Sequence, residues 1–128
     1  MSDPLTVVVT IPGLQLKSPG NRLEHWRARS RRANGQKDVV RFHLLALGKG
    51  VRDRLAAAPR LAVRFVRVGG RKMDSDNLVA ALKHCRDALA DWLQIDDGSD
   101  WYEWRWPAQE PGAGYAVRIE LEADGVAE

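Results

Sequence analysis

The chain has 128 residues, of which 45% are apolar, and a formal net charge of +3 at neutral pH. This length suits a single domain over residues 1–128 with a hydrophobic core of its own. One cysteine excludes an internal disulfide, and no apolar stretch nears the ~20 residues of a membrane span, so we expect a cytoplasmic protein without a membrane partner.

The N-terminal half predicts a strand followed by a basic, helical region. Residues Leu5 to Ile11 are rich in β-branched side chains and end at a Pro-Gly turn, which is typical of a strand. Residues 22–33 are compatible with both helix and loop, because Pro-Gly and Asn-Gly pairs flank them. From residue 36 to 55, apolar residues recur at three and four, which predicts a helix interrupted near Gly48. Eleven Lys or Arg residues against three acids make residues 17–54 the basic pole of the chain.

The C-terminal half predicts three more strands around a second helix. Residues 61–68 alternate in a way that indicates a strand with one face toward solvent or a ligand, and residues 101–106 and 115–122 also predict strands. Residues 77–93 give an amphipathic helix. Its apolar side comprises Leu78, Ala81, Leu82, Cys85, Ala88, Leu89, Trp92 and Leu93. We therefore expect an α/β (α+β) domain of order β-α-β-α-β-β, with a mixed sheet of about four strands and two main helices.

A local inversion of charge surrounds the second helix. Seven aspartates lie between Asp74 and Asp100, against only Lys83 and Arg86. Closely packed carboxylates repel one another, so a folded site that holds them usually contains a cation or raises their pKa values. Clusters of oxygen ligands suit the hard ions Mg²⁺ and Mn²⁺.

The D-x-D pair of Asp74 and Asp76 has a simpler interpretation, because Asp is common in turns and at helix N-caps. Asp76 is well placed as the cap of the second helix, although a cap accounts for only one aspartate. An EF-hand is excluded, because Leu78 stands at the third ligand position and no glutamate occupies the twelfth.

Three motifs at their observed spacing resemble the RusA-type Holliday junction resolvases, a family common in phages and prophages. They are D-x-D-N-L at Asp74–Leu78, R-D-A-L at Arg86–Leu89 and I-D-D-G at Ile95–Gly98. The segments Pro19–Arg22 and Glu24–Arg29 resemble the phage branch of the same family, so the resemblance covers most of residues 18–100.

The resemblance implies a small homodimeric α/β endonuclease, bacterial or phage-encoded, that cuts four-way DNA junctions in recombination and repair. It implies Mg²⁺ or Mn²⁺ and no organic cofactor. Asp74, Asp76 and Asp97 match the essential metal-binding aspartates, with Asp96 as a weaker neighbour. Family members carry a catalytic lysine one turn after the D-x-D, where this chain has Ala80. Lys83, seven residues after Asp76, lies only about 20° from it on a helical wheel, so we assign the role to Lys83.

DNA phosphates are expected to bind to the basic residues and their polar neighbours. The candidates are Asn21, Arg22, His25, Arg27, Arg29, Arg31, Arg32, Arg71 and Lys72.

A continuous helix from Asn77 to Leu93 would be roughly 25 Å long, which is too far for Asp76 and Asp97 of one chain to share an ion. We therefore expect two chains to pair antiparallel, so that each site takes Asp74 and Asp76 from one subunit and Asp97 from the other. Two alternatives remain open: a RusA-like DNA-binding accessory protein without cleavage activity, which Ala80 favours, and a nuclease acting on flaps or other branched DNA.

Overall fold

The computed structural model describes residues 4–14, 16 and 26–124, and for residues 26–34 it describes the backbone alone. The elements are, in order, β1 (Leu5–Pro12), α1 (Trp26–Leu45), α2 (Lys49–Ala56), β2 (Leu61–Val68), α3 (Ser75–Ala81), α4 (Lys83–Leu93), β3 (Tyr102–Trp104), β4 (Ala108–Glu110) and β5 (Ala116–Ala123). The predicted α+β class with a mixed sheet is confirmed.

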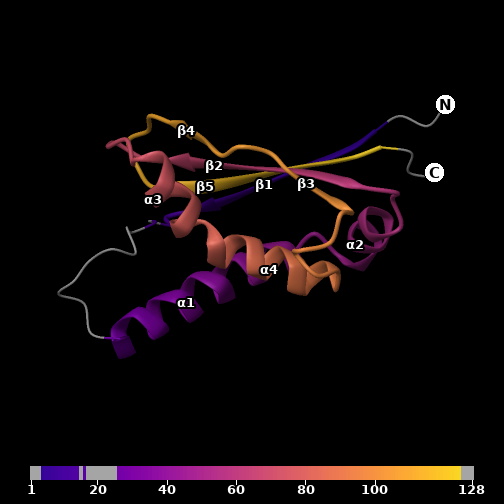
Figure 1. Ribbon diagram of the computed structural model, residues 1–128, viewed down its shortest axis with the longest axis horizontal. Coiled ribbons are helices and arrows are strands. Elements are labelled where there is room, and N and C mark those ends of the chain that lie inside the picture. Colours follow the sequence, from indigo (N-terminus) through magenta and orange to yellow (C-terminus); the bar gives the residue numbers. More distant parts are fainter. Residues whose placement is uncertain (1–3, 15, 17–25, 125–128) are drawn as a thin grey trace.

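The sheet is built around β5 and β2. β5 lies between β1 and β2 and is antiparallel to both, while the two short strands β3 and β4 pair in parallel with successive parts of the free edge of β2. The sheet is therefore about four strands wide, as predicted. The helices lie on one side of it, so the fold has two layers (Figure 1).

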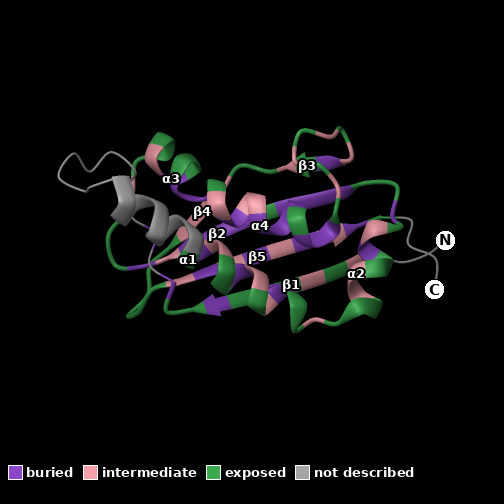
Figure 2. Ribbon diagram, turned by 90° about the horizontal axis from the view of Figure 1, so that it is seen from below, coloured by how far each residue is buried: buried purple, intermediate pink, exposed green. Residues whose placement is uncertain are grey.

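The core fills the space between these layers, and Figure 2 shows buried stretches of β2 and β5 behind the helices. Val117, Ile119 and Leu121 of β5 point to this face and are fully buried. All eight residues predicted for the apolar side of the second helix are buried, including Cys85. Among the described residues, every helix is too short or too polar to cross a bilayer.

Two predictions about the helices are wrong. The segment predicted as one helix over residues 77–93 is broken at Leu82 into α3 and α4. Leu82 keeps near-helical angles (φ −85°, ψ −4°) and stays buried, so the break leaves the apolar periodicity intact and gives no sequence signal. The Asn34-Gly35 pair, in turn, does not stop α1, which runs through it and packs against α4 through residues such as Val40 and Leu44.

Two predictions about the strands need correction. Neither face of β2 is open along its length. Arg64 is exposed, but Val66 on the same face is buried, and Arg67 on the opposite face is buried too. The strand predicted over residues 101–106 is instead the short β3, and β4 begins only after Pro107. Proline has no N–H to donate to a ladder, which is consistent with the interruption.

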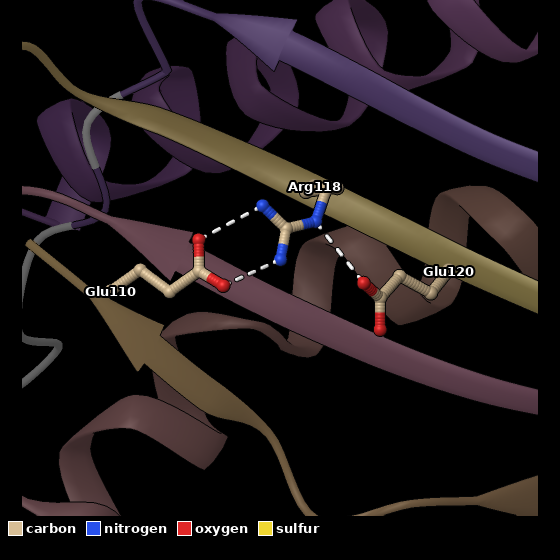
Figure 3. Close-up of polar contacts among 3 residues, drawn as sticks. All are labelled: Glu110, Arg118 and Glu120. Carbon is tan, nitrogen blue, oxygen red and sulfur yellow. Dashed lines mark hydrogen bonds and ion pairs between the residues drawn. The ribbon is translucent and has the colours of Figure 1, made fainter. Parts of the chain in front are cut away.

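An ion-pair network covers part of the sheet face that carries no helix. Arg118 on β5 makes a bidentate pair with Glu110, at 2.9 and 2.7 Å, and its Nε donates to Glu120 at 3.1 Å (Figure 3). These contacts hold the pKa of Glu110 below its usual value. Val66, the register partner of Arg118, is only 1% exposed, so the long polar side chains shield an apolar residue on this face.

Candidate functional site

The two aspartates of the D-x-D motif stand at the beginning of α3. Asp74 is the N-cap residue, with an extended backbone (φ −61°, ψ 148°), and Asp76 lies in the first turn. The prediction that Asp76 is the cap is therefore wrong. Asp74 makes no capping hydrogen bond through its side chain, and both aspartates are exposed. Capping thus leaves the Asp74 carboxylate unexplained, and the carboxylates of both residues are accessible to a ligand.

Two polar side chains from the sheet hold the loop that carries this motif. Gln109 on β4 accepts a hydrogen bond from the Met73 N–H and donates one to the Met73 carbonyl, each at 2.8 Å. Arg67, buried in β2, donates through Nη1 to the Arg71 carbonyl at 2.6 Å and to Gln109 Oε1 at 3.2 Å. Since Met73 directly precedes Asp74, the sheet positions the D-x-D motif.

Asp97 follows α4, where the chain turns back along that helix. Its carbonyl accepts hydrogen bonds from Arg86 Nη2 at 3.2 Å and from Trp104 Nε1 at 3.0 Å, and its carboxylate lies 3.7 Å from Arg86 Nε. Arg86 belongs to the first turn of α4. Asp97 therefore lies beside the N-terminal half of α4. The prediction of one continuous helix is wrong, so the length of such a helix does not measure the separation of Asp76 and Asp97.

Tyr102 fixes the same turn from the other side. Its hydroxyl donates to the Ile95 carbonyl at 2.7 Å. Burial raises the pKa of Tyr102 to about 12, and the nearby charges of Asp97 and Asp96 add to the shift. The phenol therefore stays neutral and keeps its donor proton at neutral pH.

A cleft of about 440 Å³ lies between the α3–α4 junction and the segment that follows β3. Lys83 and Asp97 both line it, so the structure brings together two of the four predicted catalytic residues. Lys83 is exposed and forms no ion pair with another described residue. Asp74 and Asp76 are not among the residues that line this cleft.

The acidic residues of α4 and the turn after it line a second groove. Its lining contains Asp87, Asp91, Asp96 and Asp97, together with Lys37. Lys37 Nζ lies 2.7 Å from Asp91 Oδ2, and Arg41 Nη2 lies 3.1 Å from the same oxygen. The hydrogen bond from Lys37, assisted by the charges of Lys37 and Arg41, lowers the pKa of Asp91. Within the described part of the chain, no three His, Cys, Asp or Glu side chains gather as a group that could hold a metal ion.

Of the predicted DNA-binding residues, Arg71 and Lys72 are exposed in the loop before Asp74, separated from it by Met73. The backbone of α1 includes Arg27, Arg29, Arg31 and Arg32, whose side chains are outside the described part. Asn21, Arg22 and His25 lie outside the described residues.

Sequence reasoning missed the residues that support the site. Arg64 and Arg67 are three positions apart, so strand alternation places them on opposite faces and one of them has to point inward. That signal was available for Arg67. Nothing in the local pattern marks Gln109, because its partner Met73 is 36 positions away in the sequence. Arg86 belongs to the R-D-A-L motif, but the pattern did not show that Arg86 and Trp104 both donate to the Asp97 carbonyl.

No family model matches the sequence, and no curated protein matches it significantly.

Proposed function

We propose that this protein is a divalent-metal-dependent endodeoxyribonuclease that resolves four-way DNA junctions by paired symmetric nicks. One observation carries the proposal. The two carboxylates of the D-x-D motif are exposed, Asp74 is not used for capping, and the loop before them is anchored by Arg67 and Gln109. A polar anchor behind two accessible carboxylates is an arrangement suited to a ligand site.

The donor set fits a hard ion, because carboxylate oxygens are the preferred ligands of Mg²⁺ and Mn²⁺. Asp74, Asp76 and Asp97 would hold the metal, with Asp96 beside them. When bound, the ion supplies charge neutralisation at the phosphate and a lowered pKa for an attacking water. Lys83 contributes a compact positive charge for the scissile phosphate from its exposed position at the start of α4. Arg71 and Lys72 bind flanking phosphates, together with the basic residues of 21–32.

The site is composite in this proposal, formed by two chains related by a twofold axis. Asp97 shares its cleft with Lys83, while Asp74 and Asp76, at the start of α3, are not among the residues that line it. Pairing of identical chains brings Asp74 and Asp76 of one subunit to Asp97 of its partner and produces two equivalent sites. Two sites per dimer match the two strands that a junction resolvase has to cut.

A synthetic mobile four-way junction, incubated over a Mg²⁺ titration, tests the activity. The enzyme nicks two opposite strands symmetrically, and Asp76→Asn abolishes nicking while the variant stays folded by circular dichroism. Asp100→Asn is the matched control, since it neutralises an exposed aspartate outside both grooves and retains activity.

The same assay separates the two alternatives. An accessory protein, which the alanine at position 80 favours, shifts the junction in a gel at every Mg²⁺ concentration without nicking it. A flap nuclease cuts a flap substrate in preference when junction and flap compete at equal concentration. Either outcome rejects junction resolution as the function.

A further inference from the structure

The cleft that contains Lys83 and Asp97 has a second character, because much of its lining is aromatic or apolar. Phe65, Val79, Trp104 and Trp106 all line it. Its volume of about 440 Å³ falls within the roughly 300–1,000 Å³ typical of small-ligand sites. A site for phosphate contacts alone needs no such wall, so the cleft offers room for an apolar group beside the charged ones.

The two tryptophans of the cleft differ in whether their rings already have partners. The Trp104 ring already has partners within the protein. It stacks on Tyr102 with ring centroids 4.6 Å apart, and the Arg86 guanidinium lies 4.2 Å from the centroid of the Trp104 ring. Trp106 is 68% exposed, and its ring stacks on no other ring among the described residues. Trp106 is thus an accessible aromatic surface in the lining of a cleft in which Trp104 already has its partners.

The charges that line the cleft indicate which kind of aromatic ligand it suits. Three cations, Lys83, Arg86 and Arg105, line the cleft against one carboxylate, Asp97. Arg86 is partly neutralised by Asp97, and Arg105 by Glu103 and Glu122 at 3.6 and 3.7 Å, which leaves Lys83 as the accessible positive charge. An aromatic ring attached to a phosphate complements an exposed tryptophan next to a lysine.

We propose that this cleft binds one unpaired nucleotide of a DNA strand, with the base stacked on Trp106 and the adjacent phosphate bound by Lys83. The inference rests on the proposed function for its biological setting, since Lys83 and Asp97 belong to that site. The binding itself requires no metal and no cleavage, so it is measured separately.

The experiment uses fluorescence anisotropy of a labelled eight-nucleotide oligothymidine in EDTA at fixed salt. Trp106→Ala weakens binding by about 5- to 150-fold, the range for loss of one base stack, whereas Trp106→Phe keeps most of the affinity. Lys83→Met weakens binding and makes the salt dependence less steep by about 0.7, the value for one phosphate contact on a single strand. Tyr115→Ala, which removes an exposed aromatic outside the cleft, is the matched control and binds like the wild type.

An oligonucleotide with abasic sites isolates the stacking contribution. The wild type binds this strand as weakly as Trp106→Ala binds the intact strand, and Trp106→Ala loses nothing further on it. The inference is overturned if the wild type does not bind the oligonucleotide, or if Trp106→Ala binds it within twofold of the wild type. It is equally overturned if Trp106→Ala only converts a dimer to a monomer, because Trp106 then contacts a second copy of the chain. Junction nicking without nucleotide binding rejects this site alone, while nucleotide binding without any nicking rejects the nuclease and keeps the site.

Discussion

Arg67 and Gln109 determine where the D-x-D motif lies, although neither carries the proposed chemistry. Arg67 is 6% exposed, and its Nε has no hydrogen-bond partner among the described residues. A buried guanidinium is costly unless its hydrogen bonds are made, so its presence in a central strand indicates that the loop position matters. The sequence could predict the aspartates of the motif. It could not predict their anchor, because Arg67 precedes the motif in the sequence, on β2, and Gln109 follows it, on β4.

Replacing Arg67 by methionine tests this anchor. The Arg71 carbonyl and Gln109 Oε1 each lose a charged donor, so we expect a loss of about 1–3 kcal/mol in unfolding free energy. Arg64→Met is the matched control, because Arg64 lies in the same strand but is exposed, and it should change stability by less than about 0.5 kcal/mol. Urea denaturation measures both. Equal stabilities for the two variants would show that Arg67 does not hold the loop.

Cys85 gives a second prediction at the scale of one residue. Complete burial raises the pKa of its thiol from 9.0 to about 12. The unfolded chain ionises above pH 9 while the folded chain does not, so the contribution is intact below pH 9 and is lost as the pH rises above it. We expect stability to fall by about 1 kcal/mol between pH 9 and 10 through this group. Cys85→Ala should lack that part of the fall.

A thiol reagent checks the same burial directly. The native protein should react with an aromatic disulfide reagent at pH 8 only as fast as it unfolds, and urea should release one equivalent at once. Immediate reaction in the absence of urea would contradict the buried position.

At the scale of elements, periodicity predicted what is buried better than where elements end. All eight residues predicted for the apolar side of residues 77–93 are buried, because burial depends on the repeat, and only Ala90 was missed. The break at Leu82 was not predicted, since the residue keeps its place in the repeat and no Gly or Pro marks it. α1 continues through Asn34-Gly35 because packing against α4 outweighs the cost of roughly 1 kcal/mol for glycine in a helix. Tertiary contacts decided both cases.

The end of α4 allows a test of local geometry. Gln94 follows the helix in the left-handed conformation (φ 58°, ψ 36°), which costs a residue other than glycine roughly 1–2 kcal/mol. Glycine removes this cost but loses more entropy on folding, so Gln94→Gly should stabilise the protein by about 0.5–1 kcal/mol. Gln94→Val should destabilise it by more than 1 kcal/mol, because β-branched residues tolerate this conformation poorly.

Thermal unfolding of both Gln94 variants gives the comparison. Glycine lowers stability when it replaces a residue inside a helix. A Gln94→Gly variant with a lower melting temperature than the wild type would therefore show that α4 continues through this residue.

At the scale of the whole molecule, the sequence predicted candidate residues but not how the path of the chain groups them. Lys83 and Asp97 share one cleft because the chain turns back after α4, a path that a helical wheel cannot describe. The aspartates of the D-x-D motif lie outside that cleft. The composite site therefore depends on pairing of two chains and stays a prediction.

Complementation between inactive variants tests the shared site most directly. Asp76→Asn and Asp97→Asn are each expected to abolish junction nicking in Mg²⁺. In a mixed dimer with shared sites, one site receives both substitutions and the other receives neither. With statistical exchange, half of the dimers are mixed and have one intact site of two, so the mixture should recover about a quarter of the wild-type activity.

The control mixes Asp74→Asn with Asp76→Asn, which leaves no intact site in any dimer and should stay inactive. Subunit exchange is verified with differently tagged chains. We predict that the first mixture recovers junction nicking and that the control mixture stays inactive. A first mixture that stays inactive despite proven exchange would contradict the shared site.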